Sequence, residues 1–364
     1  MKSKAMVLEQ FNRPLSEREF DIPPLPEDGI LVKLLASGVC GSDLHMAKGE
    51  DPRTPLPIIL GHEGVGEIVQ INGRKRDLNG EELNVGDWVI WDRGIVCNEC
   101  FWCKVAKQPY LCPNRKIYGI NLSCKDYPHL LGAYSEYMVL FRETQMIKVP
   151  KSIDPASIVL AGCSGATSMH GFDTLTEPLI GKTVVVQGAG PLGVFCVVAA
   201  KSLGASTVVM VSGTKQRLDL AKEAGADLLI NRHESSLEER IAILQNLTHN
   251  RGADVVIEAS GSSNALLEGF RLLRRGGTYL VTGVAVPQQC IPVDVYQDIV
   301  LKNIDLKGVW VSDARHLVQA VDLVIRHTKI FEKLVTHRLP LSQANEALRL
   351  VEERQALKVV LTFQ

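Results

Sequence analysis

A cluster of three glycines between a strand-like segment and a helical segment constrains the fold of this chain more than any other feature. The segment Thr183–Gln187 is an apolar, β-branched run, and Leu192–Leu203 after the glycines has helical character. Strand-like and helical segments then alternate, which predicts a doubly wound parallel sheet with helices on both faces. The further segments are Thr207–Val211, Leu228–Ile230, Val255–Glu258 and Thr278–Thr282 as strands, and Gln216–Ala224 as a helix.

The three glycines have the spacing of a dinucleotide-binding turn, Gly188-Ala-Gly190-Pro191-Leu192-Gly193. The first permits a tight turn, the second lets the backbone approach a pyrophosphate, and the third permits close packing of helix and strand. Amide groups at the start of the helix then face the phosphates. The motif alone is weak, and a purely structural turn is the alternative. Its position between strand and helix favours a nicotinamide dinucleotide.

The end of the second strand bears on the choice between NAD and NADP. NAD-binding versions of this fold place an acidic residue there, which bonds the ribose 2′-hydroxyl. This chain has no carboxylate at that place and has two cations close behind it, which favours a 2′-phosphate and therefore NADP. The alternative is that both cations are ordinary helix-surface residues. The residues concerned are Ser212, Gly213, Thr214, Lys215 and Arg217.

Four cysteines lie close together in the first half of the chain. Cys97, Cys100 and Cys103 are each separated by two residues, and Cys112 follows after eight more. Four thiolates at this spacing can surround one zinc ion with no open position, so the zinc would be structural. A redox pair explains only two of the four, and an isolated zinc module that binds partners is the rival interpretation. We therefore expect a zinc lobe near residues 93–116.

A second group of potential metal ligands is dispersed. Cys40 lies in GVCGSDLH after an expected strand, His62 lies in GHEG before another, and Cys163 lies in LAGCSGAT ahead of the nucleotide-binding segment. A single buried cysteine or histidine is more often a packing residue than a ligand. Spacing cannot bring these three residues together. Only the fold can do so.

Length, charge and cysteine count exclude several classes of protein. A chain of 364 residues exceeds one hydrophobic core, so two domains are expected. The net charge of −1 argues against a nucleic-acid-binding protein. No segment has the apolar length of a membrane span or of a signal peptide, so no membrane association is expected. Nine cysteines, an odd number, favour metal binding in a reducing cytoplasm over disulfide pairing.

Over essentially its full length the chain resembles the zinc-containing medium-chain alcohol dehydrogenases. The resemblance implies a GroES-like, irregular β catalytic domain of residues 1–160 and 308–364 and a Rossmann domain of residues 161–307. It also implies a small alcohol or carbonyl substrate and a homodimer or homotetramer. The matching pieces, in the family's order, are Gly38-Val-Cys40-Gly-Ser-Asp43, Gly61-His-Glu-Gly64, Gly86-Asp-Trp-Val89, the four-cysteine lobe and the Gly188 turn.

The resemblance implies a second, catalytic zinc held by Cys40, His62 and Cys163. Glu63 would lie beside this zinc, and Asp43 would orient His62. Three protein ligands leave one position for the substrate oxygen. There the zinc would act as a Lewis acid while a hydride passes between the substrate carbon and the nicotinamide.

The remaining roles that the resemblance implies concern protons and the cofactor. Ser42 would take the substrate proton and pass it through the cofactor ribose towards His45, whose ordinary pKa suits the task. The alternatives are a simple turn residue for Ser42 and a surface or packing histidine for His45. Lys358 would meet the pyrophosphate, or else be a solvated strand charge. Thr167 would pack against the nicotinamide, and Gly283 and Val284 are further expected cofactor contacts.

The chain departs from the family pattern at two places that matter. Eight residues separate Cys103 from Cys112 where seven are usual, and the second-strand acid is absent. Cys163 favours an alcohol dehydrogenase over a polyol enzyme, in which a glutamate often stands, although a polyol or amino-alcohol dehydrogenase is the alternative. Rivals of other classes are a zinc-free quinone or enone reductase, which needs no Cys40–His62–Cys163 set, and a non-enzymatic zinc protein.

Overall fold

The computed structural model describes residues 1–287 and 290–363. The chain divides into two compact units, one of Met1–Ala166 and Val311–Gln364 and one of Thr167–Trp310. The sequence had placed the two boundaries at 160/161 and 307/308. Among the described residues, no helix is both long and apolar enough to cross a membrane.

The first unit is built on sheets whose strands pair antiparallel except for β17 and β18, which pair in parallel. A seven-stranded sheet has the order β10-β6-β5-β3-β18-β17, and β9 also pairs with β3. A three-stranded sheet (β2-β1-β4) and a two-stranded ribbon (β7-β8) complete the strands of this unit. The bounds are β1 Lys2–Leu8, β2 Ser16–Asp21, β3 Ile30–Val39, β4 Ile58–Ile59, β5 Glu63–Ile71, β6 Trp88–Trp91, β7 Gly94–Ile95, β8 Lys116–Ile117, β9 Tyr137–Leu140, β10 Met146–Lys148, β17 Val335–Pro340 and β18 Lys358–Thr362.

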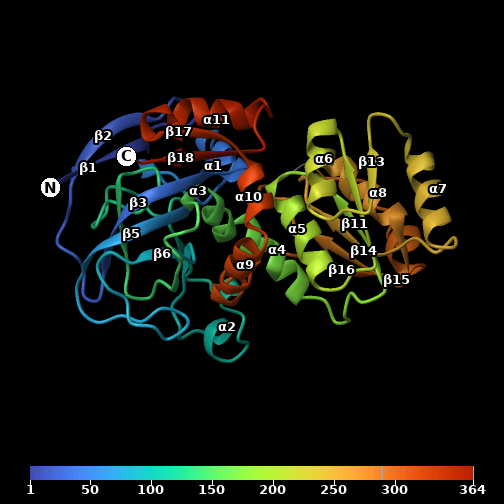
Figure 1. Ribbon diagram of the computed structural model, residues 1–364, viewed down its shortest axis with the longest axis horizontal. Helices are drawn as coiled ribbons and strands as arrows, with labels where there is room; N and C mark the ends of the chain where they lie inside the picture. The colour runs from blue at the N-terminus through green and yellow to red at the C-terminus, as the bar shows by residue number, and fades with distance from the viewer. Residues whose placement is uncertain (288–289, 364) are drawn as a thin grey trace. The chain divides into compact units, whose positions relative to one another are not determined.

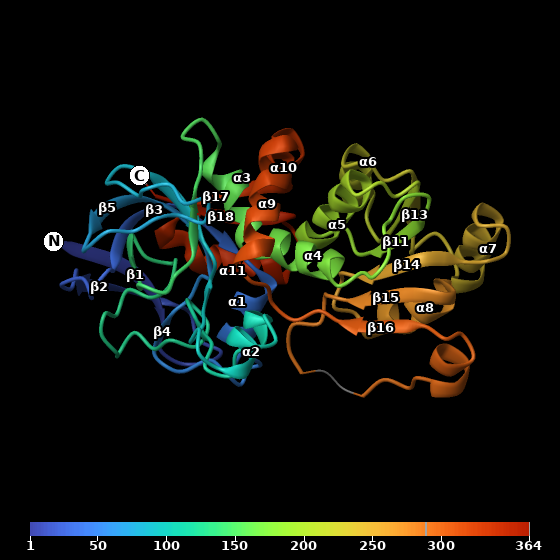
Figure 2. The same cartoon turned by 90° about the horizontal axis from the view of Figure 1, so that it is seen from below.

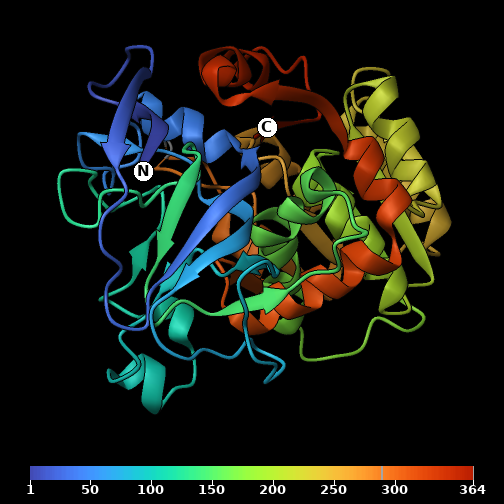
Figure 3. The same cartoon turned by 60° about the vertical axis from the view of Figure 1, so that its left-hand side comes forward.

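The C-terminal segment is part of this first unit. Strand β18 pairs antiparallel with the second half of β3, so the last strand of the chain lies beside one of the first (Figures 1 and 3). Helix α11 (Ala344–Glu352) packs on β18 and on α1 (Gly41–Ala47). Pairing with β18 supports β3 as far as Val39. The other helices of the unit are α2 Phe101–Lys104, α3 Pro155–Ile158, α9 Ala314–Arg326 and α10 Thr328–Leu334.

The second unit is the predicted doubly wound sheet, and this prediction is confirmed. Six parallel strands have the order β13-β12-β11-β14-β15-β16. Helices α5 and α6 cover one face, and α7 and α8 cover the other (Figure 2). The strands are β11 Thr183–Gln187, β12 Thr207–Ser212, β13 Leu228–Asn231, β14 Ala253–Glu258, β15 Leu273–Val281 and β16 Asp305–Gly308, and the helices are α5 Pro191–Ser202, α6 Lys215–Glu223, α7 Leu237–Leu247 and α8 Ser263–Leu272. Helix α4 (Ser164–Asp173) begins in the first unit and continues into the second.

The strand order reverses between β11 and β14. The chain leaves β11 towards β12 on one side and returns to β14 on the other, with Gln187 opposite Glu258 at the carboxyl ends of the two strands. Ligands of such sheets bind outside the carboxyl ends of the strands at this switch point. The fold therefore positions the glycine turn after β11 for a nucleotide.

Candidate active site and metal centres

The three dispersed ligand candidates meet in the first unit. Cys40 directly precedes α1, His62 directly precedes β5, and Cys163 lies between a 3-10 turn and α4. The ligand atoms of Cys40, His62, Glu63 and Cys163 all lie within 4.8 Å of one another. Two thiols, an imidazole and a carboxylate form a donor set that suits zinc. Segments far apart in sequence thus converge on a site that can hold one metal ion.

Asp43 orients the histidine of this cluster. Its Oδ1 lies 3.2 Å from Nδ1 of His62, and both side chains are buried. Its Oδ2 accepts hydrogen bonds from the Cys40 amide, at 2.8 Å, and from the Tyr134 hydroxyl, at 3.2 Å. A carboxylate on one ring nitrogen directs the other nitrogen to a metal. Burial alone would lower the pKa of His62, but Asp43 and Cys40 raise it to about 10.

The two thiols of the cluster differ in acidity. The neighbouring Cys163 thiol, together with His62, holds the pKa of Cys40 well below its usual value. The same interaction and burial raise the pKa of Cys163 well above its usual value. The Cys40 thiol therefore loses its proton more readily than the Cys163 thiol. Zinc binding requires both sulfurs as thiolates.

Glu63 is paired with a lysine from the last strand of the chain. Nζ of Lys358 lies 2.8 Å from Oε1 and 2.7 Å from Oε2 of Glu63, and both side chains are buried. A Cβ on Gly38 would meet Oε2 at 2.0 Å, so a glycine is required there. Burial lowers the pKa of Lys358, but the Glu63 carboxylate more than offsets this and raises it. The alternative of a solvated strand charge at Lys358 is wrong, because only 3% of the residue is exposed.

Ser42 and His45 lie on the same short helix, next to the cluster. The Ser42 hydroxyl is 3.8 Å from the Cys40 sulfur. The His45 ring pairs through Nδ1 with Glu50, and both of these side chains are partly exposed. Ser42 therefore lies beside a candidate metal ligand, and His45 lies about one helical turn further along and is partly exposed.

The four-cysteine lobe also has the geometry of a metal site. The Sγ atoms of Cys100 and Cys103 are 3.5 Å apart, those of Cys97 and Cys112 are 3.5 Å apart, and those of Cys100 and Cys112 are 3.9 Å apart. Zinc–sulfur bonds of roughly 2.3 Å in a tetrahedron require separations of about 3.8 Å. Backbone amides of Glu99 and Cys100 lower the pKa of Cys97 to about 6. The extra residue before Cys112 therefore leaves the four thiols together.

The glycine turn in the second unit has the close contacts that its motif predicts. Gly188 has a φ of +101°, and a Cβ there would lie 2.8 Å from the Ser260 side chain. A Cβ on Gly193 would lie 1.7 Å from the Gly188 carbonyl oxygen, so helix and turn touch directly. Gly190 caps α5 and Pro191 is its first residue. The amides at the start of a 12-residue helix are thus available to an anion.

Cations gather around the end of β12. Ser212 ends this strand, and a Cβ on Gly213 would lie 2.9 Å from Nε of Arg232 and 2.6 Å from Nε2 of His233. Nη1 of Arg217 lies 3.5 Å from the Ala189 carbonyl oxygen within the glycine turn. Lys215 is different. Its side chain is 87% exposed and pairs with Asp219, as the surface alternative expected. Sequence reasoning missed Arg232 and His233, because they follow the next strand, β13, and belong to no motif.

Sequence reasoning also missed a buried carboxylate at the switch point. Oε1 of Glu258 accepts hydrogen bonds from the Ser260 amide and hydroxyl and from the Gly261 amide, at 2.6 to 2.7 Å. This carboxylate holds the loop that packs against Gly188 and against Gly283 after β15. Val284 follows Gly283, and Thr167 lies on α4. Glu258 therefore shapes the surroundings of the nucleotide turn without belonging to it.

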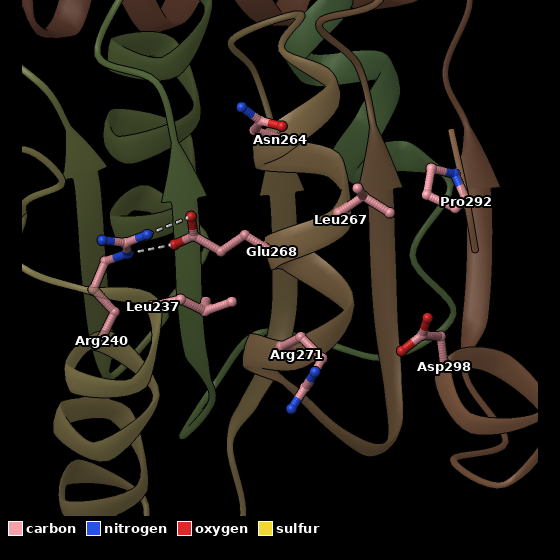
Figure 4. Close-up of a pocket in the computed structure, with 8 residues that line it drawn as sticks. All are labelled: Leu237, Arg240, Asn264, Leu267, Glu268, Arg271, Pro292 and Asp298. Atoms are coloured by element: carbon pink, nitrogen blue, oxygen red, sulfur yellow. Dashed lines mark hydrogen bonds and ion pairs between the residues drawn. The ribbon is translucent and has the colours of Figure 1, made fainter. Parts of the chain in front are cut away.

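A separate cavity of about 430 Å³ lies in the second unit, lined by residues of α7, α8 and the segment that includes the π-helical turn Val295–Val300 (Figure 4). Arg240 and Glu268 form a two-pronged ion pair on its wall. The cavity includes no residue of the glycine turn or of the metal clusters. Its lining residues are Leu237, Arg240, Asn264, Leu267, Glu268, Arg271, Pro292 and Asp298.

A nucleotide-binding parallel sheet joined to a unit with two zinc-type clusters defines a metal-dependent nicotinamide oxidoreductase. Residues 26–151 match the model of the alcohol dehydrogenase GroES-like domain, and residues 191–326 match that of the zinc-binding dehydrogenase. The chain belongs to the zinc-binding medium-chain alcohol dehydrogenase family. It is a zinc-dependent alcohol dehydrogenase that uses NAD or NADP.

Individual relatives cover nearly all of the chain. The structure is similar to that of an alcohol dehydrogenase from Thermotoga maritima, with a TM-score of 0.97 and 57% identity over 100% of this chain and 99% of the other. A zinc-binding dehydrogenase from Sinorhizobium meliloti, bound to NADP, has a TM-score of 0.86 and 28% identity over the whole of both chains.

Two curated relatives are identical to this chain at 31% of the aligned positions. One is 5-exo-hydroxycamphor dehydrogenase from Pseudomonas putida, for which the alignment covers 99% of this chain and 98% of the relative. The other is L-threonine 3-dehydrogenase from Pyrococcus horikoshii, for which the coverage is 95% and 94%.

Proposed function

We propose that Cys40, His62 and Cys163 hold the catalytic zinc at which a small alcohol is oxidised, or its ketone or aldehyde reduced. The observation that carries this proposal is the convergence of their ligand atoms, with that of Glu63, within 4.8 Å. Zinc bound there supplies a Lewis acid that favours the deprotonated form of a substrate hydroxyl. Asp43 fixes the ring of His62, and Lys358 holds the carboxylate of Glu63 beside the cluster.

The proton released on oxidation leaves through Ser42 and His45 in this proposal. The Ser42 hydroxyl beside Cys40 would accept the proton from the substrate oxygen and donate its own proton onward towards His45. The partly exposed His45, which pairs with Glu50, receives the proton and passes it to solvent. In the reduction direction the same groups deliver a proton to the new hydroxyl.

NADP is the proposed preferred cofactor. Its pyrophosphate would bind at Gly188, Gly190, Pro191, Leu192 and Gly193, where helix α5 begins. Its 2′-phosphate would lie at Ser212, Gly213 and Thr214, because Arg232 and His233 lie against Gly213 and no carboxylate ends β12. Arg217, which contacts the glycine turn, is a further basic group nearby. The relative from Sinorhizobium meliloti is bound to NADP. Thr167, Gly283, Val284 and Lys358 are the further proposed cofactor contacts, and Lys215 remains a weaker candidate.

The four-cysteine lobe is proposed to hold a structural zinc. Its four sulfurs would complete the coordination of one zinc ion and would leave no position for substrate. Both zinc sites need reduced thiols, which favours the cytoplasm as the location of the protein.

A homodimer or homotetramer is the proposed assembly. The edge strand β16 is paired on one side only within the described chain. Exposed apolar side chains lie on this strand and just before it. An open strand edge beside apolar side chains suits pairing with a second copy. These side chains are Val295, Tyr296, Val300, Leu301 and Leu306.

A substrate and cofactor panel tests the proposed function. Primary and secondary alcohols, polyols, amino alcohols and the matching carbonyl compounds are assayed with NAD(H) and with NADP(H) by the absorbance of the reduced nicotinamide. Wild type and Cys124→Ala, in which a buried cysteine outside both clusters is changed, should turn over at least one alcohol in the presence of zinc. Cys40→Ala should be inactive while folded. Equal activity in Cys40→Ala would refute the zinc assignment, and activity without zinc would favour a zinc-free reductase.

A further inference from the structure

A buried arginine, Arg93, lies beside the cluster of Cys40, His62 and Cys163. Arg93 follows β6, and only 4% of the residue is exposed. Its Nη1 donates a hydrogen bond of 3.0 Å to the carbonyl oxygen of Gly162, which directly precedes the proposed zinc ligand Cys163. The guanidinium is therefore anchored at the wall of the metal site. An arginine remains charged when buried, so it requires anionic or polar partners.

The free edge of this guanidinium is the edge that arginines use to bind carboxylates. Among the described residues, none accepts a hydrogen bond from Nε or Nη2 of Arg93. Elsewhere in this protein, Nε and Nη2 of Arg240 donate hydrogen bonds to the two carboxylate oxygens of Glu268, at 2.8 and 3.0 Å (Figure 4). Arg53 binds Asp51 in the same way. A planar two-pronged fork of this kind matches a carboxylate in shape and charge.

The acidic side chains near Arg93 are committed to other partners. Glu63 is paired with Lys358, and Asp43 binds His62, Tyr134 and the Cys40 amide. Asp92 lies 3.6 Å from Arg115 and accepts from the Gly94 amide.

The free edge of Arg93 is also open to a ligand. Nε and Nη1 of Arg115 have no hydrogen-bond partner and are inaccessible to solvent. Nε and Nη2 of Arg93 also lack a partner among the described residues, but they retain some solvent accessibility. Burial lowers the pKa of Arg93, but the nearby Cys163, Asp92, Cys40 and Glu63 more than offset this and raise it, so the guanidinium stays charged. A ligand that enters the metal site can supply the hydrogen-bond acceptor that no described residue provides for Nε and Nη2.

We propose that the Nε–Nη2 edge of Arg93 binds a carboxylate carried by the substrate, so that the enzyme acts on hydroxy acids and the corresponding keto acids. This inference rests on the proposed zinc site, because it requires the carbinol oxygen at the metal while the carboxylate reaches Arg93. Arg93 then acts as a specificity residue. It selects the substrate by its charged end and orients the carbinol carbon, while the hydride and proton steps stay those already described.

Matched pairs of substrates test this inference. Each pair combines a hydroxy acid with a neutral counterpart: 3-hydroxybutanoate with 2-butanol, D-gluconate with D-sorbitol, and L-threonine with its methyl ester. The ratio of kcat/KM for the acid to that for its counterpart is measured in wild type, Arg93→Gln, Arg93→Lys and Arg240→Gln. Zinc content and unfolding midpoint of each variant show whether it is folded and loaded. Arg240→Gln is the matched control, because it removes a buried arginine far from the metal cluster in sequence and in the other unit.

Wild type should have a higher kcat/KM for the acid than for its neutral counterpart in at least one pair. Arg93→Gln should reduce this ratio by about 10- to 100-fold, because it removes charge-assisted hydrogen bonds to the carboxylate. Arg93→Lys keeps the charge but not the fork, so it should restore only part of the preference. Arg240→Gln should leave the ratio as in wild type.

Several outcomes would overturn the inference while the proposed function stands. These are active wild type with no acid preference in any pair, an unchanged ratio in Arg93→Gln, or a clear preference for a phosphorylated alcohol such as glycerol 3-phosphate. Wild type that binds zinc and cofactor yet oxidises neither member of any pair nor any alcohol of the panel would instead refute the proposed function, and the inference with it.

Discussion

Lys358 and Glu63 form a buried ion pair in which Nζ lies 2.8 and 2.7 Å from the two carboxylate oxygens, although 295 positions separate the residues in sequence. The pair joins the last strand of the chain to the segment that carries His62. Glu63 lies opposite Gly38 on β3, and β18 pairs with the end of the same strand. The C-terminal strand is therefore part of the support of the metal site.

Removing only one partner of this pair should be more harmful than removing both. Lys358→Met leaves the buried Glu63 carboxylate without its partner and should cost about 3–5 kcal/mol of unfolding free energy. The double variant Glu63→Gln/Lys358→Met removes both charges and should recover part of this loss. Urea unfolding of the zinc-loaded single and double variants measures the coupling. Losses that simply add would contradict a direct buried pair.

Removing one cysteine of the lobe should affect stability before chemistry. Cys100→Ala should lose the lobe's metal and lower the melting temperature, on the order of 5–10 °C, because a structural zinc contributes binding free energy to folding. Cys124→Ala, which removes a buried thiol outside both clusters, serves as the control and should lose less. The melting temperature and the zinc content per chain are measured for wild type and both variants. An unchanged melting temperature in Cys100→Ala would rule out a structural metal in the lobe.

The cations around Gly213 should select the cofactor. Arg232→Ala should raise the dissociation constant of NADPH roughly tenfold and leave that of NADH nearly unchanged, because only NADPH carries the 2′-phosphate. Ser212→Asp should shift the preference towards NADH by adding the carboxylate that β12 lacks. Fluorescence titration with both reduced cofactors checks each variant. Equal effects on the two cofactors would place the 2′-phosphate elsewhere.

Uptake of the catalytic zinc should become tighter as pH rises. In the metal-free protein the pKa of His62 is about 10, and that of Cys163 is raised as well, so both groups hold protons at neutral pH that zinc must displace. Each displaced proton makes the apparent affinity rise roughly tenfold per pH unit below the pKa. Zinc titrations that follow restored turnover between pH 6.5 and 8.5 report this site alone. Asp43→Asn should flatten the dependence, since Asp43 raises the pKa of His62, whereas a flat profile in wild type would contradict it.

Features that depend on local spacing could be predicted from the sequence. The four cysteines of the lobe lie within one short segment, and the glycine turn follows its strand directly, so both could be recognised without a fold. The central strands β11, β12 and β14 are buried on both faces and stand out as continuous apolar runs, whereas the mostly exposed edge strand β16 does not. For example, β11 has the expected bounds.

Features created by tertiary contact could not be predicted in this way. Cys40, His62 and Cys163 came together only through the family resemblance. No pattern pointed to Arg93, Arg232 or Glu258, because each owes its place to a neighbour distant in sequence. Strand β9 begins only at Tyr137, since the amide of the preceding Tyr134 bonds to the distant Leu60 carbonyl oxygen. Local propensity does not encode such partners.

Metal stoichiometry combined with turnover tests the central claim most directly. Wild type, His62→Ala and the control His337→Ala, which changes a partly exposed histidine of the same unit, are purified with zinc and analysed for metal per chain. Wild type and His337→Ala should contain about two zinc ions and oxidise the alcohol chosen from the panel, whereas folded His62→Ala should contain about one and be inactive. A folded His62→Ala protein with undiminished zinc and turnover would contradict a catalytic metal shared by Cys40, His62 and Cys163.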